Sequence, residues 1–175
     1  MSRDIRREAR ILLRHPLGLL ACGAGSGLSP WASGTTGSAA AVLLFWAGGA
    51  QHWPWWWNLG LAAGLFAAGV AAAGWACRAL ASDDAAPIVV DEWVGQWLTL
   101  AAGTLTWPRL AEPGWLLAML VAGFLLFRIA DIVKPWPAAR LDRELGGGIG
   151  AMADDAVAGA YSAAALAALG GWLPG

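Results

Sequence analysis

Acidic side chains stand in three short motifs of this 175-residue chain, each inside or beside an apolar stretch. The motifs are "VVDEWVG", "FRIADIVKPWP" and "AMADDAVAG", and they supply Asp91, Glu92, Asp131, Asp154 and Asp155. An ionisable group at bilayer depth is costly, so each is a candidate functional residue. Carboxylates gathered in a partly desolvated site repel one another unless a cation neutralises them. Hard oxygen ligands without His or Cys favour magnesium, so these five residues are the predicted catalytic and metal-binding set.

Basic residues beside these motifs suit either the carboxylates or a bound phosphate. Arg128, Asp131 and Lys134 recur at every third position, which predicts one polar stripe if a helix runs through all three. The simpler alternative is that the acids only form interfacial ion pairs with Arg128, Lys134, Arg140 and Arg143. Two adjacent acidic pairs together with Asp131 favour a binding site over that alternative.

The elements that must position these groups are predicted to be membrane helices. The chain is 58% hydrophobic and only 13% charged, far more apolar than an ordinary soluble domain. Stretches of the roughly 20 apolar residues that a span needs lie at 55–77, 88–107, 115–133 and 149–172, with a shorter one at 36–53. We therefore expect an all-α integral membrane protein, a bundle of four to five transmembrane helices. Residues 1–14 would form a basic cytoplasmic arm and 15–175 a single membrane-embedded domain.

The distribution of Lys and Arg predicts the orientation of this bundle. Five of the eleven basic residues lie in the first fourteen positions, and the loops after the second and fourth predicted spans hold most of the others. Basic flanks stay in the cytoplasm, so the N-terminus and all three acidic motifs are expected at the cytoplasmic face. Many of the 13 Trp residues lie at the opposite ends, as in an aromatic belt. The net charge of −1 gives no footprint for nucleic acid, and the oligomeric state is not readable.

A Gly-rich stretch, "GAGSGLSPWASGTTGS", precedes the first predicted span. Its backbone N–H groups and hydroxyls have the chemistry of a phosphate cradle, although no Gly-Lys-Ser/Thr follows. A re-entrant or interfacial structural segment is an equally good interpretation. Farther along, Gly95 follows Glu92 by three residues and Gly159 follows Asp155 by four, which predicts close helix packing beside the acids.

Together, these motifs resemble the bacterial phosphatidylglycerophosphatase A family in order and spacing. The resemblance rests on the Gly-rich stretch, "IVVDEWVGQWLT" and "FRIADIVKPWPAARLDRELGGGIGAMADDAVAGAYS". It implies a magnesium-dependent lipid phosphatase of the bacterial inner membrane. The implied reaction, on the cytoplasmic side, hydrolyses the terminal phosphomonoester of phosphatidylglycerophosphate to phosphatidylglycerol and phosphate.

Within this resemblance, the five carboxylates are expected to hold and orient Mg²⁺, which polarises the phosphoryl group and positions a hydroxide. Expected substrate contacts are Gly25, Ser26, Gly27, Thr35, Arg128, Lys134 and Arg143. A carboxylate nucleophile forming an aspartyl-phosphate remains an open alternative. Cysteine-based phosphatase chemistry is excluded because neither cysteine begins a Cys-x5-Arg motif. A phosphatase for another phosphorylated lipid and a small cation-coupled transporter are the alternative functions.

Overall fold

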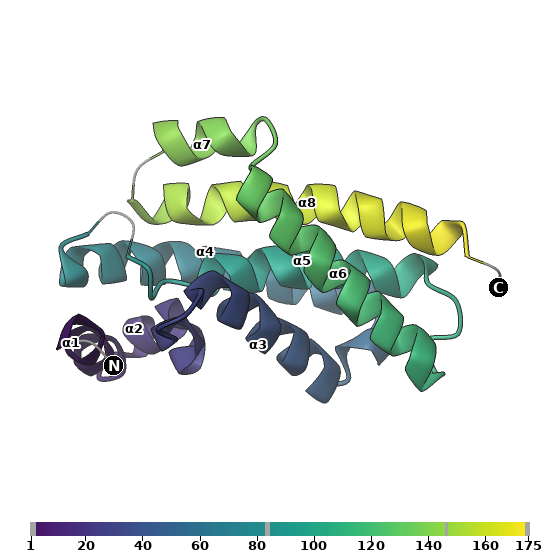
Figure 1. Ribbon diagram of the computed structural model, residues 1–175, viewed down its shortest axis with the longest axis horizontal. Coiled ribbons are helices and arrows are strands. Elements are labelled where there is room, and N and C mark those ends of the chain that lie inside the picture. The colour runs from purple at the N-terminus through teal and green to yellow at the C-terminus, as the bar shows by residue number, and fades with distance from the viewer. Residues whose placement is uncertain (1–2, 83–84, 146, 174–175) are drawn as a thin grey trace.

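The described residues, 3–82, 85–145 and 147–173 of a computed structural model, form helices and no strand (Figure 1). The long helices are α3 (Ser33–Ala47), α4 (Trp55–Leu80), α5 (Val90–Thr106), α6 (Pro113–Val133) and α8 (Gly147–Gly171). The short ones are α1 (Arg3–Leu12), α2 (Pro16–Ala21) and α7 (Ala138–Glu144), with 3₁₀ helices at Gly23–Leu28 and Ala50–His52. The all-α prediction is confirmed for the described part of the chain.

Helix α5 lies at the centre of the bundle and packs against α3, α4, α6 and α8. Its buried positions are distributed around the helix rather than along one stripe and include Val94, Gln96 and Leu100. A helix that is covered on all sides has little freedom to move relative to its neighbours. The first turn of α5, which carries Asp91 and Glu92, is therefore held firmly.

Helices α4 and α6 are long and apolar enough to cross a membrane. Only 33% and 22% of their most apolar windows is buried inside the protein, unlike the core helices of a soluble domain. On α6 the exposed side chains Leu117, Val121, Leu125 and Ile129 recur every four residues and form one apolar stripe. An exposed apolar surface of this kind is typical of membrane contact.

The other predicted spans, over α3, α5 and α8, stay predictions. At 1.5 Å per residue, the 15 residues of α3 and the 17 of α5 extend about 22 and 25 Å, less than the hydrocarbon core of about 30 Å. Helix α8 has 25 residues and is long enough, but it carries an acidic pair. Membrane association through α4 and α6 is thus supported, while the number of spans is not fixed.

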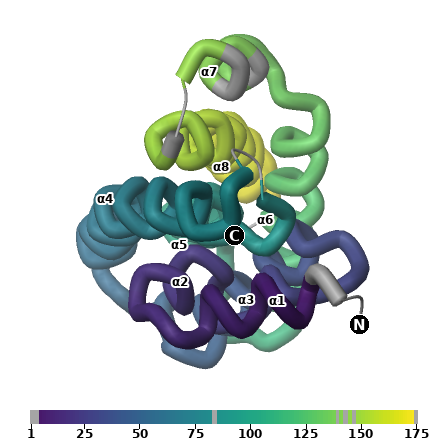
Figure 2. The backbone as a smooth tube through the Cα atoms, turned by 90° about the vertical axis from the view of Figure 1, so that its left-hand side faces the viewer, coloured from purple at the N-terminus to yellow at the C-terminus, as the bar shows by residue number. Residues whose placement is uncertain are grey.

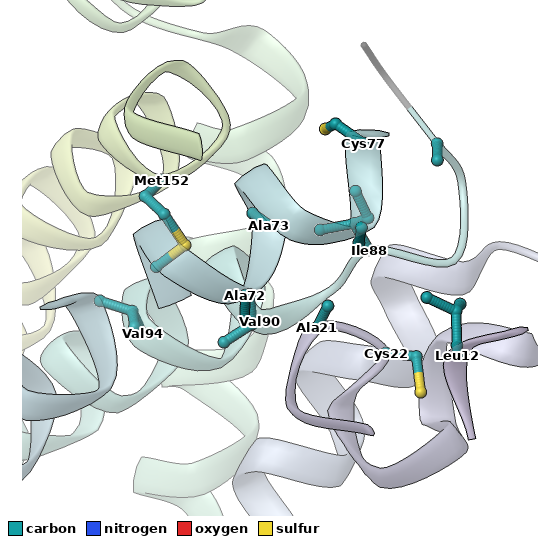
Figure 3. Close-up of a cluster of buried hydrophobic side chains, with 12 residues drawn as sticks. Leu12, Ala21, Cys22, Ala72, Ala73, Cys77, Ile88, Val90, Val94 and Met152 are labelled. Atoms are coloured by element: carbon teal, nitrogen blue, oxygen red, sulfur yellow. The ribbon is translucent and has the colours of Figure 1, made fainter. Parts of the chain in front are cut away.

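The N-terminal helices pack onto the bundle through apolar side chains (Figure 3). Leu12 of α1 and Ala21 of α2 are fully buried and belong to one cluster with Ala73 of α4 and Val90 of α5. His15 accepts a hydrogen bond from the backbone N–H of Leu17 at the start of α2. Helices α1 and α2 lie on the opposite side of the bundle from α7 (Figure 2).

The two ends of the bundle differ in composition. The first turns of α5 and α8 lie toward the end occupied by α1 and α2, whereas α3 ends and α4 and α6 begin toward the other (Figure 1). That other end presents the exposed rings of Trp46, Trp55 and Trp57. These three tryptophans are therefore separated from the acidic motifs along the long axis, whereas Trp93 and Trp136 lie within the motifs themselves. The orientation in the membrane stays a prediction.

Candidate functional site

The site begins at the first turn of α5, where Asp91 and Glu92 are adjacent. The carboxylate of Asp91 accepts a hydrogen bond from the backbone N–H of Glu92 at 3.0 Å. Negative side chains are favoured at a helix N-terminus because the unpaired N–H groups there carry partial positive charge. The first turn of α5 alone therefore brings two carboxylates together, without a contribution from another helix.

Close packing of α5 on α8 brings a third carboxylate, that of Asp155, to the same place. The backbones touch where Gly95 faces Gly159, and the hydroxyl of Thr99 donates to the carbonyls of both glycines, at 2.9 and 3.3 Å. One oxygen from each of Asp91, Glu92 and Asp155 can be chosen so that all three lie within 4.8 Å of one another. The predicted close packing beside the acids is confirmed, and the structure shows that the two helices pack on each other.

The remaining acids of the predicted set surround this trio. Asp131, near the end of α6, faces Asp155 and Glu92, while Asp154 lies within electrostatic range of Asp91 and Asp155. Asp154 and Asp155 are both almost fully buried. The structure therefore gathers all five carboxylates from three helices, and their individual roles stay predictions.

Arg128 connects the acidic cluster to α3. Its Nη1 lies 2.7 Å from the carboxylate of Asp131 and donates to the hydroxyl of Ser38 at 3.3 Å. Gly34, one turn earlier on α3, lies directly against Glu92 and Arg128, and a Cβ there would collide with the Glu92 carboxylate. A larger residue at this point of α3 would therefore require the Glu92 carboxylate to shift.

The polar stripe predicted through Arg128, Asp131 and Lys134 is wrong for Lys134. Helix α6 ends at Val133, and Lys134 takes the left-handed conformation with φ 47°. The following Pro135 disfavours helical backbone at the residue before it and has no N–H to continue the ladder. Lys134 instead reaches α8, where its ammonium lies 2.8 Å from the carboxylate of Asp154.

Two buried polar atoms at the centre of the site have no hydrogen-bond partner among the described residues. They are Oε2 of Glu92 and Nε of Arg128. A buried polar atom without a partner is costly, and a bound ligand is one way to satisfy it. A cation suits the carboxylate oxygen and an anion suits the guanidinium. The all-carboxylate donor set fits Mg²⁺, which prefers hard oxygen ligands.

The Gly-rich segment folds differently from an open phosphate loop. The hydroxyl of Ser26 donates to the carbonyl of Gly23 at 2.8 Å, and Gly27 is packed against the carbonyl of Pro87. Gly25 has φ 101°, and a Cβ there would meet no described atom within 4 Å. Thr35 lies in the first turn of α3. The predicted substrate contacts in this segment, by Gly25, Ser26, Gly27 and Thr35, stay predictions. Arg143 belongs to α7, and its side chain lies outside the described part.

Sequence reasoning missed the two α3 residues that touch the charged cluster, Gly34 and Ser38. Both belong to the Gly-rich stretch, so its position beside the site was indicated, but the contacting residues were not. Their spacing of four places them on one face of α3. Residues of α3 and α6 are ninety positions apart at the Ser38–Arg128 contact, and no local pattern reports such a pairing.

Comparison of the sequence with known protein families identifies one matching family model. Residues 19–170 match the family model described as Phosphatidylglycerophosphatase A. The chain is 38% identical over 168 residues to the phosphatidylglycerophosphatase A of Escherichia coli (strain K12), which covers 93% of this chain and 88% of that protein. It is 35% identical over 173 residues to the Haemophilus influenzae protein of the same name, covering 94% of each.

A third relative carries a different name. The putative phosphatidylinositol-3-phosphatase of Bacteroides thetaiotaomicron is 37% identical over 152 residues, covering 82% of this chain and 87% of that protein. No solved structure matches the chain.

Proposed function

Because the chain belongs to the phosphatidylglycerophosphatase A family, we propose that it is a magnesium-dependent phosphatase for phosphatidylglycerophosphate. It is an enzyme, a phosphatase, by this membership. The proposed products are phosphatidylglycerol and inorganic phosphate. The proposed location is the bacterial inner membrane, with the N-terminus and the site facing the cytoplasm.

The observation that carries the magnesium proposal is the trio of Asp91, Glu92 and Asp155, whose oxygens converge within 4.8 Å. These three residues would hold the ion directly, with Asp131 and Asp154 beside them. When bound, Mg²⁺ supplies charge neutralisation for the phosphoryl group and lowers the pKa of a coordinated water. The Oε2 of Glu92, which has no hydrogen-bond partner within the described part of the chain, supports a ligand at this position.

The basic residues of the site suit the phosphate group of the substrate. Hydrolysis forms a bond from phosphorus to a water oxygen and breaks the bond to the terminal glycerol oxygen, which takes up a proton. Negative charge is spread over the phosphoryl oxygens during this exchange, and fixed positive charge nearby lowers the barrier. The Nε of Arg128 has no partner among the residues that the structure describes, so it is available to donate to such an oxygen. Lys134 positions Asp154 through their 2.8 Å ion pair.

Phosphate release by the purified full-length protein tests the proposal. We expect release from phosphatidylglycerophosphate with Mg²⁺, loss of release with excess chelator, and a decrease of about 10²–10³-fold or more in Asp155→Asn. The matched control is Glu112→Gln, which neutralises an exposed carboxylate at the start of α6 and should keep wild-type activity. Full activity in chelator, or in Asp155→Asn, would contradict the carboxylate site.

A phosphatase for phosphoinositides is the second candidate, favoured by the name of the Bacteroides relative. Both reactions remove a phosphomonoester from a membrane lipid, so the same site serves either. Parallel assays decide between them: a higher kcat/KM for phosphatidylinositol 3-phosphate than for phosphatidylglycerophosphate would replace the first substrate by the second.

A further inference from the structure

An apolar groove of about 640 Å³ lies between α3 and α6 and opens to the outside of the bundle. Its walls include Val42, Leu43 and Trp46 on α3 and Leu117, Val121 and Phe124 on α6. Its volume falls within the range of about 300–1,000 Å³ that is usual for ligand sites. Several of these side chains, such as Leu43 and Leu117, are more than half exposed.

The groove adjoins the candidate active site on both helices. On α6, Leu117, Val121, Phe124 and Arg128 follow one another at spacings of four, three and four, so they share one helix face. On α3, Ser38 precedes Val42 by four residues in the same way. The Arg128–Ser38 hydrogen bond therefore joins the two walls at the polar end of the groove.

We propose that this groove holds an acyl chain of the phospholipid substrate while its phosphate lies at Arg128 and the carboxylates. This inference rests on the proposed function, because it takes the substrate to be a lipid. At 1.5 Å per residue, the wall extends about 10 Å on α3, from Ala39 to Trp46, and about 16 Å on α6, from Pro113 to Phe124. The longer wall is close to the thickness of one leaflet, about 15 Å. The protein offers charged side chains at one end and an apolar groove at the other, which match the head group and the acyl chain of such a lipid.

The groove orients the substrate rather than attracting it. Lipid tails in the bilayer are already in an apolar environment, so moving one into the groove gains little from the hydrophobic effect. Confinement of the chain instead fixes the position of the phosphate relative to the carboxylates, and such positioning contributes strongly to rate. The opening between α3 and α6 also gives the substrate a lateral path from the bilayer.

Val121→Trp is the test variant, because Val121 is half exposed and a larger ring there fills the groove without entering the core. Ala118→Trp is the matched control: it adds the same ring to an exposed position of α6 that does not line the groove. We expect Val121→Trp to lower kcat/KM for dioleoyl phosphatidylglycerophosphate about tenfold relative to that for the dihexanoyl form. Ala118→Trp should leave this ratio unchanged, and an equal ratio in both variants would overturn the proposal.

A photoreactive lipid gives a second readout that does not depend on turnover. Phosphatidate with a diazirine in the middle of one acyl chain is cross-linked to the full-length protein in nanodiscs, and the labelled peptides are mapped. We expect labelling concentrated on α3 and α6, reduced by Val121→Trp and not by Ala118→Trp. Labelling spread evenly over α4 and α8, or labelling that Val121→Trp leaves unchanged, would overturn the proposal.

These two readouts separate failure of the groove from failure of the proposed function. If the folded wild-type protein releases no phosphate from any lipid, the function fails, whereas the labelling pattern still reports the groove. If phosphate is released but labelling is even, only the groove proposal fails.

Discussion

Replacement of Gly159 by alanine tests whether close packing of α5 on α8 sets the geometry of the carboxylate trio. A Cβ at Gly159 would lie 2.6 Å from the carbonyl oxygen of Gly95 and 2.7 Å from its Cα, whereas ordinary contacts begin at 3.4 Å. Both obstacles are backbone atoms, which cannot rotate aside as a side chain can. The helices must therefore separate by about 0.8 Å, the difference between 2.6 and 3.4 Å.

This separation acts directly on the site. Asp155 lies one turn before Gly159, and Glu92 lies about one turn before Gly95, so their oxygens move apart by a similar distance. A misplacement of about 1 Å can lower a rate by about 10²-fold, and overpacking costs about 1–3 kcal/mol of folding free energy. We expect Gly159→Ala to lower kcat about 10²-fold, to require more Mg²⁺ for half-maximal activity, and to unfold at a lower temperature.

The assay is phosphate release as a function of Mg²⁺ concentration, with thermal unfolding in the same detergent. Gly64→Ala in α4 is the control, because a Cβ there meets no atom of the described residues within 4 Å. It should keep wild-type kinetics and unfold at the same or a higher temperature, since alanine favours a helix over glycine by about 1 kcal/mol. Wild-type kcat and Mg²⁺ dependence in Gly159→Ala would refute the link between helix packing and site geometry.

Three further substitutions or treatments probe the fold and the chemistry. Asn58→Ala removes the buried acceptor of the Trp97 indole N–H. Denaturant unfolding should therefore show a free energy of unfolding that is lower by about 1–3 kcal/mol, and an unchanged midpoint would contradict this. Lys134→Met removes the ion-pair partner of buried Asp154. This substitution should lower the free energy of unfolding by about 2 kcal/mol, less than the 3–5 kcal/mol that breaking a fully buried pair costs. It should also lower kcat. Wild-type stability together with wild-type kcat would exclude the positioning role of Lys134. N-ethylmaleimide should leave phosphate release unchanged, because both cysteines are buried and burial raises the pKa of the Cys22 thiol; rapid inactivation would point to thiol chemistry.

The sequence by itself indicated the helical class, the acidic residues that the structure brings together, and close helix packing beside those acids. Long apolar stretches favour helices that satisfy their own backbone hydrogen bonds, so α4 and α6 follow from composition and length. Carboxylates in apolar surroundings mark functional groups wherever they occur, which singled out Asp91, Glu92 and Asp155. Gly95 and Gly159, each placed about one turn after those acids, indicated that each helix packs closely on a neighbour. The structure makes these two glycines each other's neighbours.

Tertiary structure alone decided which neighbours each side chain meets. Asp154 and Asp155 are adjacent in sequence, yet successive helical residues point about 100° apart. Asp154 therefore pairs with Lys134 while Asp155 joins the trio. Likewise, the contact of Ser38 with Arg128 depends on how α3 and α6 are rotated and crossed within the bundle. Local spacing fixes the faces of each helix, but the packing of the whole bundle decides which faces meet.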